Sequence, residues 1–236
     1  MRSNTSGADL SMKNSPITER FKIDFTASFV TDGGLRRRVE ELREFYDPQC
    51  AGYFEQILSK RKEAFCDSAS AFMLLDSLLQ KNGIDRYKTA ILLDDNGRPY
   101  IDDSELDFSV SHSEGCAICV LAMGEGAAVG CDVQRARQYS EEKLAELAQA
   151  FMTADELSEF GKAADRSAFF FTKWTRREAY VKRVCLDIFD NLKTADLSGE
   201  YFRDGVITAC GERYFFSVNT MPPEITPETF DNVEIE

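Results

Sequence analysis

Apolar and polar residues alternate with two different periods along the first third of the chain. At residues 21–25 every second side chain is apolar, which is the pattern of a half-buried strand. Over residues 35–81 apolar side chains recur at three- and four-residue spacing, which predicts helices with an interruption at residues 47–48. The Asn-Gly pair at residues 82–83 is expected to end the last helix, because both residues tolerate a left-handed backbone.

After residue 90 the pattern changes to short apolar runs, and helices and strands then alternate again. The expected strands lie at residues 91–93, 108–110, 116–122 and 127–133, the helices at 141–151, 154–162 and 167–182, and the last strands at 199–202, 206–209 and 214–218. Gly205 and Gly211 are expected at the turns between these last strands. The order of elements predicts an α+β protein made of two similar α+β halves.

This order divides the chain into four segments. Residues 1–17 are polar and are predicted to be a flexible leader, and residues 223–236 are predicted to be an acidic tail. Between them we expect an N-terminal α+β half at residues 18–126 and a C-terminal α+β half at residues 127–222. Each half is expected to be a small antiparallel sheet packed with helices.

The composition of the 236-residue chain is that of a globular protein, with a hydrophobic share of 43% that is enough for a sizeable core. No apolar run approaches the roughly 20 residues of a membrane span, so we expect no membrane association. The N-terminus lacks an apolar signal segment and the seven cysteines form no disulfide pattern, which predicts reduced thiols and a cytoplasmic location. Cys116 and Cys119 are interpreted as buried strand residues.

The net charge of −13 argues against a nucleic-acid partner, because the field of the protein repels a phosphate backbone. The charge is uneven, however. Residues 173–183 contain five basic side chains and a single acidic one, Glu178. This segment is interpreted, with equal weight, as a site for a compact anion or as a solvated helix face.

His112 is the only histidine and lies between Ser111 and Ser113, where a predicted strand runs into a turn. A lone histidine is more often structural than functional. Here three hydrogen-bonding side chains and the free backbone N–H groups of a strand end favour the binding of phosphate oxygens. A serine hydrolase is excluded, since adjacent strand residues point to opposite faces and no G-x-S-x-G motif exists.

Asp132 and Gln134 are two residues apart, so on a strand their side chains share one face. An aspartate among apolar strand residues must be neutralised, either by a nearby arginine or by a metal ion. Oxygen ligands of this kind favour Mg²⁺, which takes one or two carboxylates together with substrate phosphates and water.

Trp174, Glu178 and Lys182 are spaced four residues apart and form one stripe on the last predicted helix. A glutamate–lysine pair at this spacing usually does no more than support a surface helix. This stripe also carries the only tryptophan and lies in the most basic segment of the chain. It is therefore interpreted as a helix face toward a magnesium-bound pyrophosphate.

Four short motifs occur in order between residues 91 and 183. They are Gly-Arg-Pro at 97–99, Ser-His-Ser at 111–113, Gly-Cys-Asp-Val-Gln at 130–134, and Trp-x-x-Arg-Glu-x-x-x-Lys at 174–182. In this order and at these spacings they resemble the 4′-phosphopantetheinyl transferase superfamily, in its surfactin-synthetase-type (Sfp-like) branch. The helices before this range and the strands after it resemble the family only in their type of secondary structure.

The resemblance implies that the 4′-phosphopantetheine arm of coenzyme A is transferred to a serine of an apo carrier, with release of adenosine 3′,5′-bisphosphate. The carrier would be an acyl carrier protein or a peptidyl or polyketide carrier domain of fatty-acid, polyketide or nonribosomal-peptide synthesis. The resemblance further implies a monomer whose halves are related by pseudo-twofold symmetry, with coenzyme A and Mg²⁺ between them.

The resemblance also implies roles for individual residues. Asp132 and Glu178 would bind the metal, with Gln134 or a water in the third position, and Lys182 would stabilise the charge on the pyrophosphate. Coenzyme A would contact Arg98, Pro99, Ser111, His112, Asp132 and Lys182, with Ser111 and His112 at the 3′-phosphate and Lys60 or Arg61 as further candidates there.

Glu156 has two interpretations of equal weight. Residues 151–156, Phe-Met-Thr-Ala-Asp-Glu, resemble a family motif whose glutamate implies a catalytic general base for the carrier serine. Residues 153–156 also have the sequence of a capping box that opens a helix.

Four departures from the family motifs bear on the function. Gln134 stands where the family often has a third acid, Arg177 stands where it has a lysine, Val-Cys-Leu at 184–186 lacks its Gly-Lys pair, and the family's upstream arginine for the 3′-phosphate has no clear counterpart. Gln134 and the missing Gly-Lys pair favour, as the alternative, a coenzyme A- or carrier-binding module with weak or no transferase activity. A Mg²⁺-dependent phosphohydrolase of another kind is a further alternative.

Overall fold

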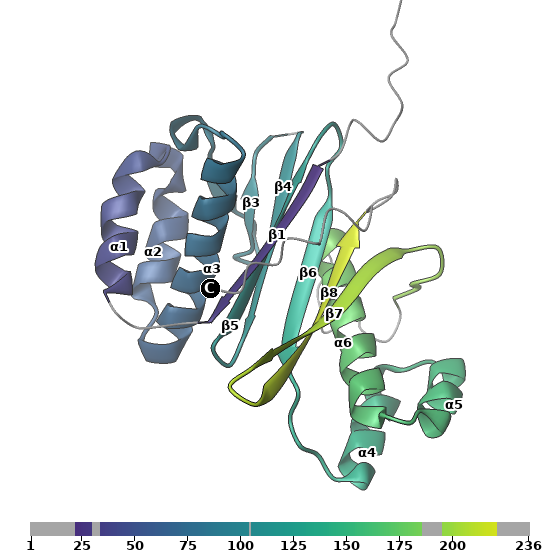
Figure 1. Cartoon of the computed structure of the whole chain (residues 1–236). Helices are drawn as coiled ribbons and strands as arrows, with labels where there is room; N and C mark the ends of the chain where they lie inside the picture. The colour runs from purple at the N-terminus through teal and green to yellow at the C-terminus, as the bar shows by residue number, and fades with distance from the viewer. Residues whose placement is uncertain (1–21, 30–33, 104, 186–194, 221–236) are drawn as a thin grey trace, which may run out of the picture.

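The computed structural model describes residues 22–29, 34–103, 105–185 and 195–220, and these residues form four layers (Figure 1). Three helices cover one face of a three-stranded sheet, and a second three-stranded sheet packs against the other face. Three more helices lie beyond the second sheet. Both sheets are antiparallel, so the predicted α+β fold with small antiparallel sheets is confirmed.

The first helical layer follows the three- and four-residue spacing of the sequence. Its helices are α1 (Leu35–Leu42), α2 (Ala51–Ser59) and α3 (Lys62–Lys81), with short 3₁₀ helices at Arg43–Phe45, Pro48–Cys50 and Arg86–Lys88. The predicted interruption is present, because Pro48 begins a 3₁₀ helix that Asp47 caps with its side chain. Asn82 ends α3 and Gly83 follows with a φ of 67°, as the sequence predicts.

The first sheet has the order β1 (Lys22–Phe29), β5 (Cys116–Met123) and β4 (Leu106–Ser113). A separate hairpin pairs β2 (Ile91–Leu93) with β3 (Pro99–Ile101), and β3 is a strand that the pattern of the sequence does not predict. The central strand β5 is buried on both faces. Cys119 packs toward the helices and Cys116 toward the second sheet, and both are free thiols, which confirms them as buried strand residues.

The second sheet has the order β6 (Val129–Arg135), β8 (Glu212–Thr220) and β7 (Tyr201–Ala209). Val129, Cys131 and Val133 of β6 pack toward the first sheet. Asp132 and Gln134 therefore face the other way, toward α6 (Arg166–Arg183), as expected from the two-residue period. Helices α4 (Glu141–Phe151) and α5 (Ala154–Lys162) bury apolar side chains against α6.

The last strands differ from the prediction in one respect. The segments predicted as separate strands at 199–202 and 206–209 overlap the single strand β7, which begins only at Tyr201, and Gly205 lies inside it rather than at a turn. A Cβ at Gly205 would collide with the ring of Phe216 on β8, so this glycine makes room for an aromatic side chain on the neighbouring strand. The turn lies at Cys210 and Gly211, which both have positive φ.

A row of polar side chains, which we call the polar seam, joins the two sheets along β4 and β6. Among the strands that the structure describes, β6 pairs only with β8, so the N–H groups of its other edge need acceptors. Side-chain oxygens from every second residue of β4 accept these bonds. They run from Val129 N to Asp107 Oδ2 (2.7 Å), Cys131 N to Ser109 Oγ (3.0 Å), Val133 N to Ser111 Oγ (3.3 Å) and Arg135 N to Ser113 Oγ (3.1 Å).

Several features predicted from the sequence are not tested by the described residues. The leader at 1–17 and the acidic tail at 223–236 lie outside the described residues. The division into halves at residues 126 and 127, the pseudo-twofold symmetry and the monomeric state stay predictions. Within the described ranges no helix is long and apolar enough to cross a membrane.

Gly130 lets α6 approach β6 at backbone distance. A Cβ at this position would collide with the Ala179 carbonyl oxygen and would lie 2.6 Å from the Arg183 backbone nitrogen. On the same strand and helix, Lys182 Nζ lies 2.8 Å from Asp132 Oδ1.

We expect Gly130→Ala to destabilise the protein by about 1–3 kcal/mol or more, since the backbone atoms it meets cannot move aside as a flexible side chain does. Urea unfolding measures this change. Gly161→Ala in α5 is the matched control, because no atom lies within 4 Å of an added Cβ there and alanine favours a helix. Wild-type stability of Gly130→Ala would contradict the close packing of α6 on β6.

Candidate functional site

Asp132, Glu178 and Lys182 meet between β6 and α6. The Asp132 side chain is only 1% exposed, and its Oδ1 lies 2.8 Å from Lys182 Nζ. Glu178 lies one helical turn before Lys182, and its carboxylate interacts directly with that of Asp132. The two predicted metal ligands therefore lie together. The alternative of an arginine as the partner of Asp132 is wrong, because the partner is Lys182.

Two carboxylates share one ammonium group in this cluster, and the pKa values reflect this arrangement. Burial, and then the charge of Asp132, raise the pKa of Glu178 to about 7. Burial alone would lower the pKa of Lys182, but Asp132 and Glu178 outweigh burial and raise this pKa above its ordinary value. The cluster thus carries a surplus of negative charge that a further cation would neutralise.

The donor atoms suit a hard divalent cation. Asp132 and Glu178 provide carboxylate oxygens, and the Gln134 amide lies beside them with its Nε2 3.4 Å from Asp132 Oδ2. In the part of the chain that the structure describes, no group of three or more His, Cys, Asp or Glu side chains is placed to hold a metal ion. A cation here would need water or substrate oxygens to complete its shell, which is how Mg²⁺ is commonly bound.

Ser111 belongs to the same cluster, although it comes from the other sheet. Its hydroxyl donates to Asp132 Oδ1 at 2.8 Å and accepts from Lys182 Nζ at 3.1 Å. The resemblance implies a contact between Ser111 and the 3′-phosphate, and that contact stays a prediction.

His112 lies next to this cluster on β4, with 39% of its side chain exposed and its Nδ1 3.6 Å from Asp67 Oδ2 on α3. Partial burial lowers the pKa of His112, Asp67 opposes this effect, and the charges of Lys182 and Lys60 lower the pKa further. Lys60, which donates to Ser68 Oγ at 2.7 Å, is therefore within electrostatic range of His112. Asp67 is a neighbour of the site that the motifs do not predict.

Arg98 reaches from the β2–β3 hairpin to the end of α6, where its Nη1 lies 2.8 Å from Cys185 Sγ. The charge of Arg98 also acts on Cys131 of β6, so this side chain approaches the strand that carries Asp132. Pro99 begins β3 and is partly buried, and Arg61 precedes α3 and is exposed. The structure thus brings Arg98 toward the cluster, whereas Arg61 lies on the surface.

The basic segment at 173–183 is not a solvated face, because its cations pair with acids of the same chain and are largely buried. The pairs are Lys173 and Arg177 with Glu156, Arg176 with Asp204, Lys182 with Asp132, and Arg183 with Glu200. A cavity of about 610 Å³ borders Lys173, Arg176 and Arg177. Since these three charges are already paired, the cavity walls provide little attraction for an anion.

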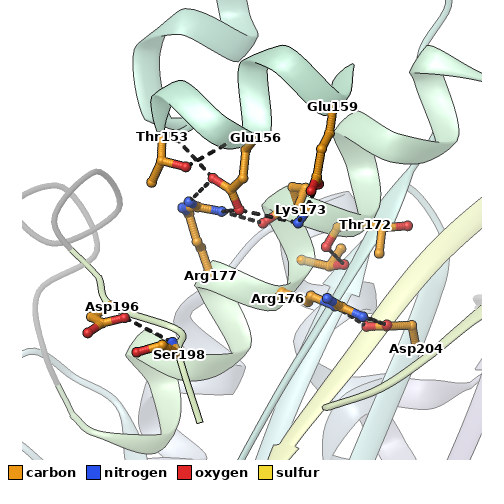
Figure 2. A network of polar contacts seen from close by, with 11 residues as sticks. Thr153, Glu156, Glu159, Thr172, Lys173, Arg176, Arg177, Asp196, Ser198 and Asp204 are labelled. Atoms are coloured by element: carbon orange, nitrogen blue, oxygen red, sulfur yellow. Dashed lines mark hydrogen bonds and ion pairs between the residues drawn. The ribbon is translucent and has the colours of Figure 1, made fainter. Parts of the chain in front are cut away.

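Glu156 lies at the start of α5 in the network shown in Figure 2. Its backbone N–H donates to Thr153 Oγ1 (3.3 Å) and its carboxylate accepts from the Thr153 N–H (3.0 Å), which confirms the capping box. Arg177 of α6 donates to both carboxylate oxygens, and Lys173 Nζ lies 3.4 Å away. Burial alone would raise the pKa of Glu156, but these bonds lower it to about 2.

A comparison with protein-family models gives a match to the C-terminal part of the chain. The family model of the 4′-phosphopantetheinyl transferase superfamily matches residues 128–221, which include Asp132, Glu156, Glu178 and Lys182. A search of curated proteins found no similar protein. The match is a similarity to this transferase superfamily over less than half of the chain, and the Sfp-like branch stays a prediction.

We expect Glu156→Gln to lower the free energy of unfolding by about 2–3 kcal/mol at pH 7, because a carboxylate with a pKa of about 2 stabilises the fold above its ordinary pKa of 4.5. This stabilisation is lost as the pH falls from 4.5 toward 2. The variant should therefore show a shallower loss of stability over that range in urea titrations.

Glu141→Gln is the matched control, since Glu141 also lies in the first turn of a helix and pairs with an arginine, but its side chain is 70% exposed. Exposed pairs contribute little, so its stability should stay near that of wild type. Equal losses in the two variants would contradict the buried ion pair between α5 and α6.

Proposed function

We propose that this protein transfers the 4′-phosphopantetheine arm of coenzyme A to a serine of an apo carrier protein, in a Mg²⁺-dependent reaction that releases adenosine 3′,5′-bisphosphate. The observation that carries the proposal is the meeting of Asp132 and Glu178 beside Lys182. All three residues lie in the range that matches the superfamily model.

The reaction moves a phosphoryl group between two oxygens. The serine Oγ forms a bond to the β-phosphorus of coenzyme A, and the bond from this phosphorus to the bridging oxygen breaks. Adenosine 3′,5′-bisphosphate leaves with the electron pair of that bond, and the serine loses its proton. A bound magnesium ion would draw electron density from the pyrophosphate oxygens and lower the cost of the developing charge.

The residues of the chain supply position and charge for this reaction. Asp132 and Glu178 offer metal ligands from a strand and a helix that are packed rigidly together. Lys182 would stabilise the charge on the pyrophosphate, because a cation held in place beforehand needs no reorganisation as the charge grows. Lys60 places further positive charge on the side of α3 and β4, where the 3′-phosphate is proposed to bind, and His112 offers a ring nitrogen there as a hydrogen-bond donor.

The serine proton needs an acceptor, and two glutamates are candidates. Glu156 has a pKa of about 2, and its carboxylate is bound by Arg177, Lys173 and the Thr153 amide, so its affinity for a proton is low at neutral pH. Glu178 has a pKa of about 7, but a metal ion bound to its carboxylate would lower this pKa and occupy its oxygens. The pKa therefore favours neither carboxylate for this step, and a general base at Glu156 stays a prediction.

Gln134 supports one competing function. An amide binds Mg²⁺ more weakly than a third carboxylate, so a module that binds coenzyme A or a carrier without efficient transfer is the alternative. A phosphohydrolase, the further alternative, would release phosphate without any carrier. Mass spectrometry of a panel of apo carriers incubated with coenzyme A and Mg²⁺ separates these functions, because only the transferase adds the mass of one phosphopantetheine arm.

We expect Asp132→Asn and Glu178→Gln each to lower kcat/KM in this assay by at least about a hundredfold, since each removes a charged ligand from the proposed metal. Asp76→Asn is the matched control. Asp76 is also a buried aspartate, with a side chain 4% exposed and paired to Arg86, but it lies among the helices of the first layer.

The control should lose stability and keep its specific activity when assayed below its unfolding temperature. Retained transfer by Asp132→Asn or Glu178→Gln would overturn the assignment of these two residues to the metal. A wild-type protein that binds coenzyme A but modifies no carrier would favour the binding module.

A further inference from the structure

We infer that Ser111 is a positioning residue for Asp132 and not a ligand of the coenzyme A phosphates. The inference rests on the proposed function for its setting, since it concerns how the same site is held in shape. It departs from the role that the motif resemblance implies for this serine.

The hydroxyl of Ser111 has no bonding capacity left for a phosphate. A serine hydroxyl has one proton to donate and two lone pairs to accept with. Its proton is donated to Asp132 Oδ1 at 2.8 Å, and it accepts from Val133 N at 3.3 Å and Lys182 Nζ at 3.1 Å. The side chain is also buried, with Ser111 only 6% exposed. A bond to phosphate would require the loss of one of these three.

The polar seam fixes this hydroxyl in place before any ligand binds. Ser111 is the third of four residues of β4 whose side-chain oxygens accept the free N–H groups of β6. Its Oγ therefore accepts from the backbone N–H of Val133, which directly follows Asp132 on β6. Asp132 is thus oriented from the opposite sheet, and its orientation depends on the register of β4 against β6.

This arrangement assigns different tasks to the two oxygens of Asp132. Oδ1 is bound by Ser111 and by Lys182, whereas Gln134 Nε2 lies at the longer distance of 3.4 Å from Oδ2, and the Glu178 carboxylate also contacts this aspartate. The carboxylate is held most firmly at Oδ1, which leaves Oδ2 as the oxygen that a cation would bind more readily. Ligand-orienting hydrogen bonds of this kind commonly change metal affinity ten- to a hundredfold when they are removed.

Ser109 provides a matched control within the same seam. It is also buried, at 4% exposed, and its Oγ accepts the Cys131 N–H at 3.0 Å in the way that Ser111 accepts from Val133. Ser109→Ala and Ser111→Ala therefore each leave one N–H group of β6 without its acceptor. They differ in that only Ser111 also bonds Asp132 and Lys182.

The test measures Mn²⁺ binding by electron paramagnetic resonance in the presence of coenzyme A, together with transfer from coenzyme A and from 3′-dephospho-coenzyme A. We expect Ser111→Ala to weaken Mn²⁺ binding about ten- to a hundredfold, and Ser109→Ala to change it by no more than about threefold. Ser111→Thr, which keeps a hydroxyl, should restore binding. Transfer from the two substrates should fall by the same factor in Ser111→Ala.

The opposite results would overturn the inference. Equal Mn²⁺ affinities of Ser111→Ala and Ser109→Ala would show that Ser111 does not position Asp132. If Ser111→Ala instead lost the preference for coenzyme A over its dephospho form, Ser111 would be a ligand of the 3′-phosphate. If Ser111→Ala does not fold, Ser111→Cys replaces it, because a thiol is only a weak donor. Failure of the wild type to modify carriers would refute the proposed function, and the Mn²⁺ measurement would still decide the role of Ser111.

Discussion

The contact between α6 and β6 determines where the charged groups of the site lie. Gly130 lets the two backbones touch, so the carboxylate of Asp132 and the side chains of Glu178 and Lys182 share one small, largely buried space. Burial raises the pKa of Glu178, and repulsion from the nearby carboxylate of Asp132 raises it further. A bound divalent cation would relieve this repulsion, which links the packing of one helix directly to the proposed chemistry.

The rest of the molecule holds this strained group of charges in place. The polar seam ties β6 to the first sheet through short side chains, and Ser111 extends that tie to Asp132 itself. On the far side of α6, Arg177 and Glu156 fasten α5 to the same helix through a nearly buried ion pair. The basic segment of the sequence therefore serves mainly to anchor α6, and Lys182 is the member of it that enters the site.

The parts of the fold that depend on residues adjacent in the chain could be predicted from the sequence. Helices α4 and α5 have the predicted bounds, and their first residues were predictable because Ser140 and Thr153 cap them locally. The faces of Asp132 and Glu178 on their own elements could be predicted from the spacing, whereas their meeting was implied by the resemblance of the motifs to a known family. The length of β7 could not be predicted in this way, because Gly205 makes room for the ring of Phe216 on another strand. The partners of Ser111 depend in the same way on how two sheets align, and the alternation of polar residues from Asp107 to Ser113 was the one available sign of the seam.

The most direct test of the central claim is a crystal structure with coenzyme A and Mn²⁺, in which anomalous scattering locates the metal. The account predicts one ion bonded to carboxylate oxygens of both Asp132 and Glu178 and to oxygens of the coenzyme A pyrophosphate, with Lys182 beside them. An ion bound elsewhere, or a pyrophosphate that lies away from these two carboxylates, would contradict it.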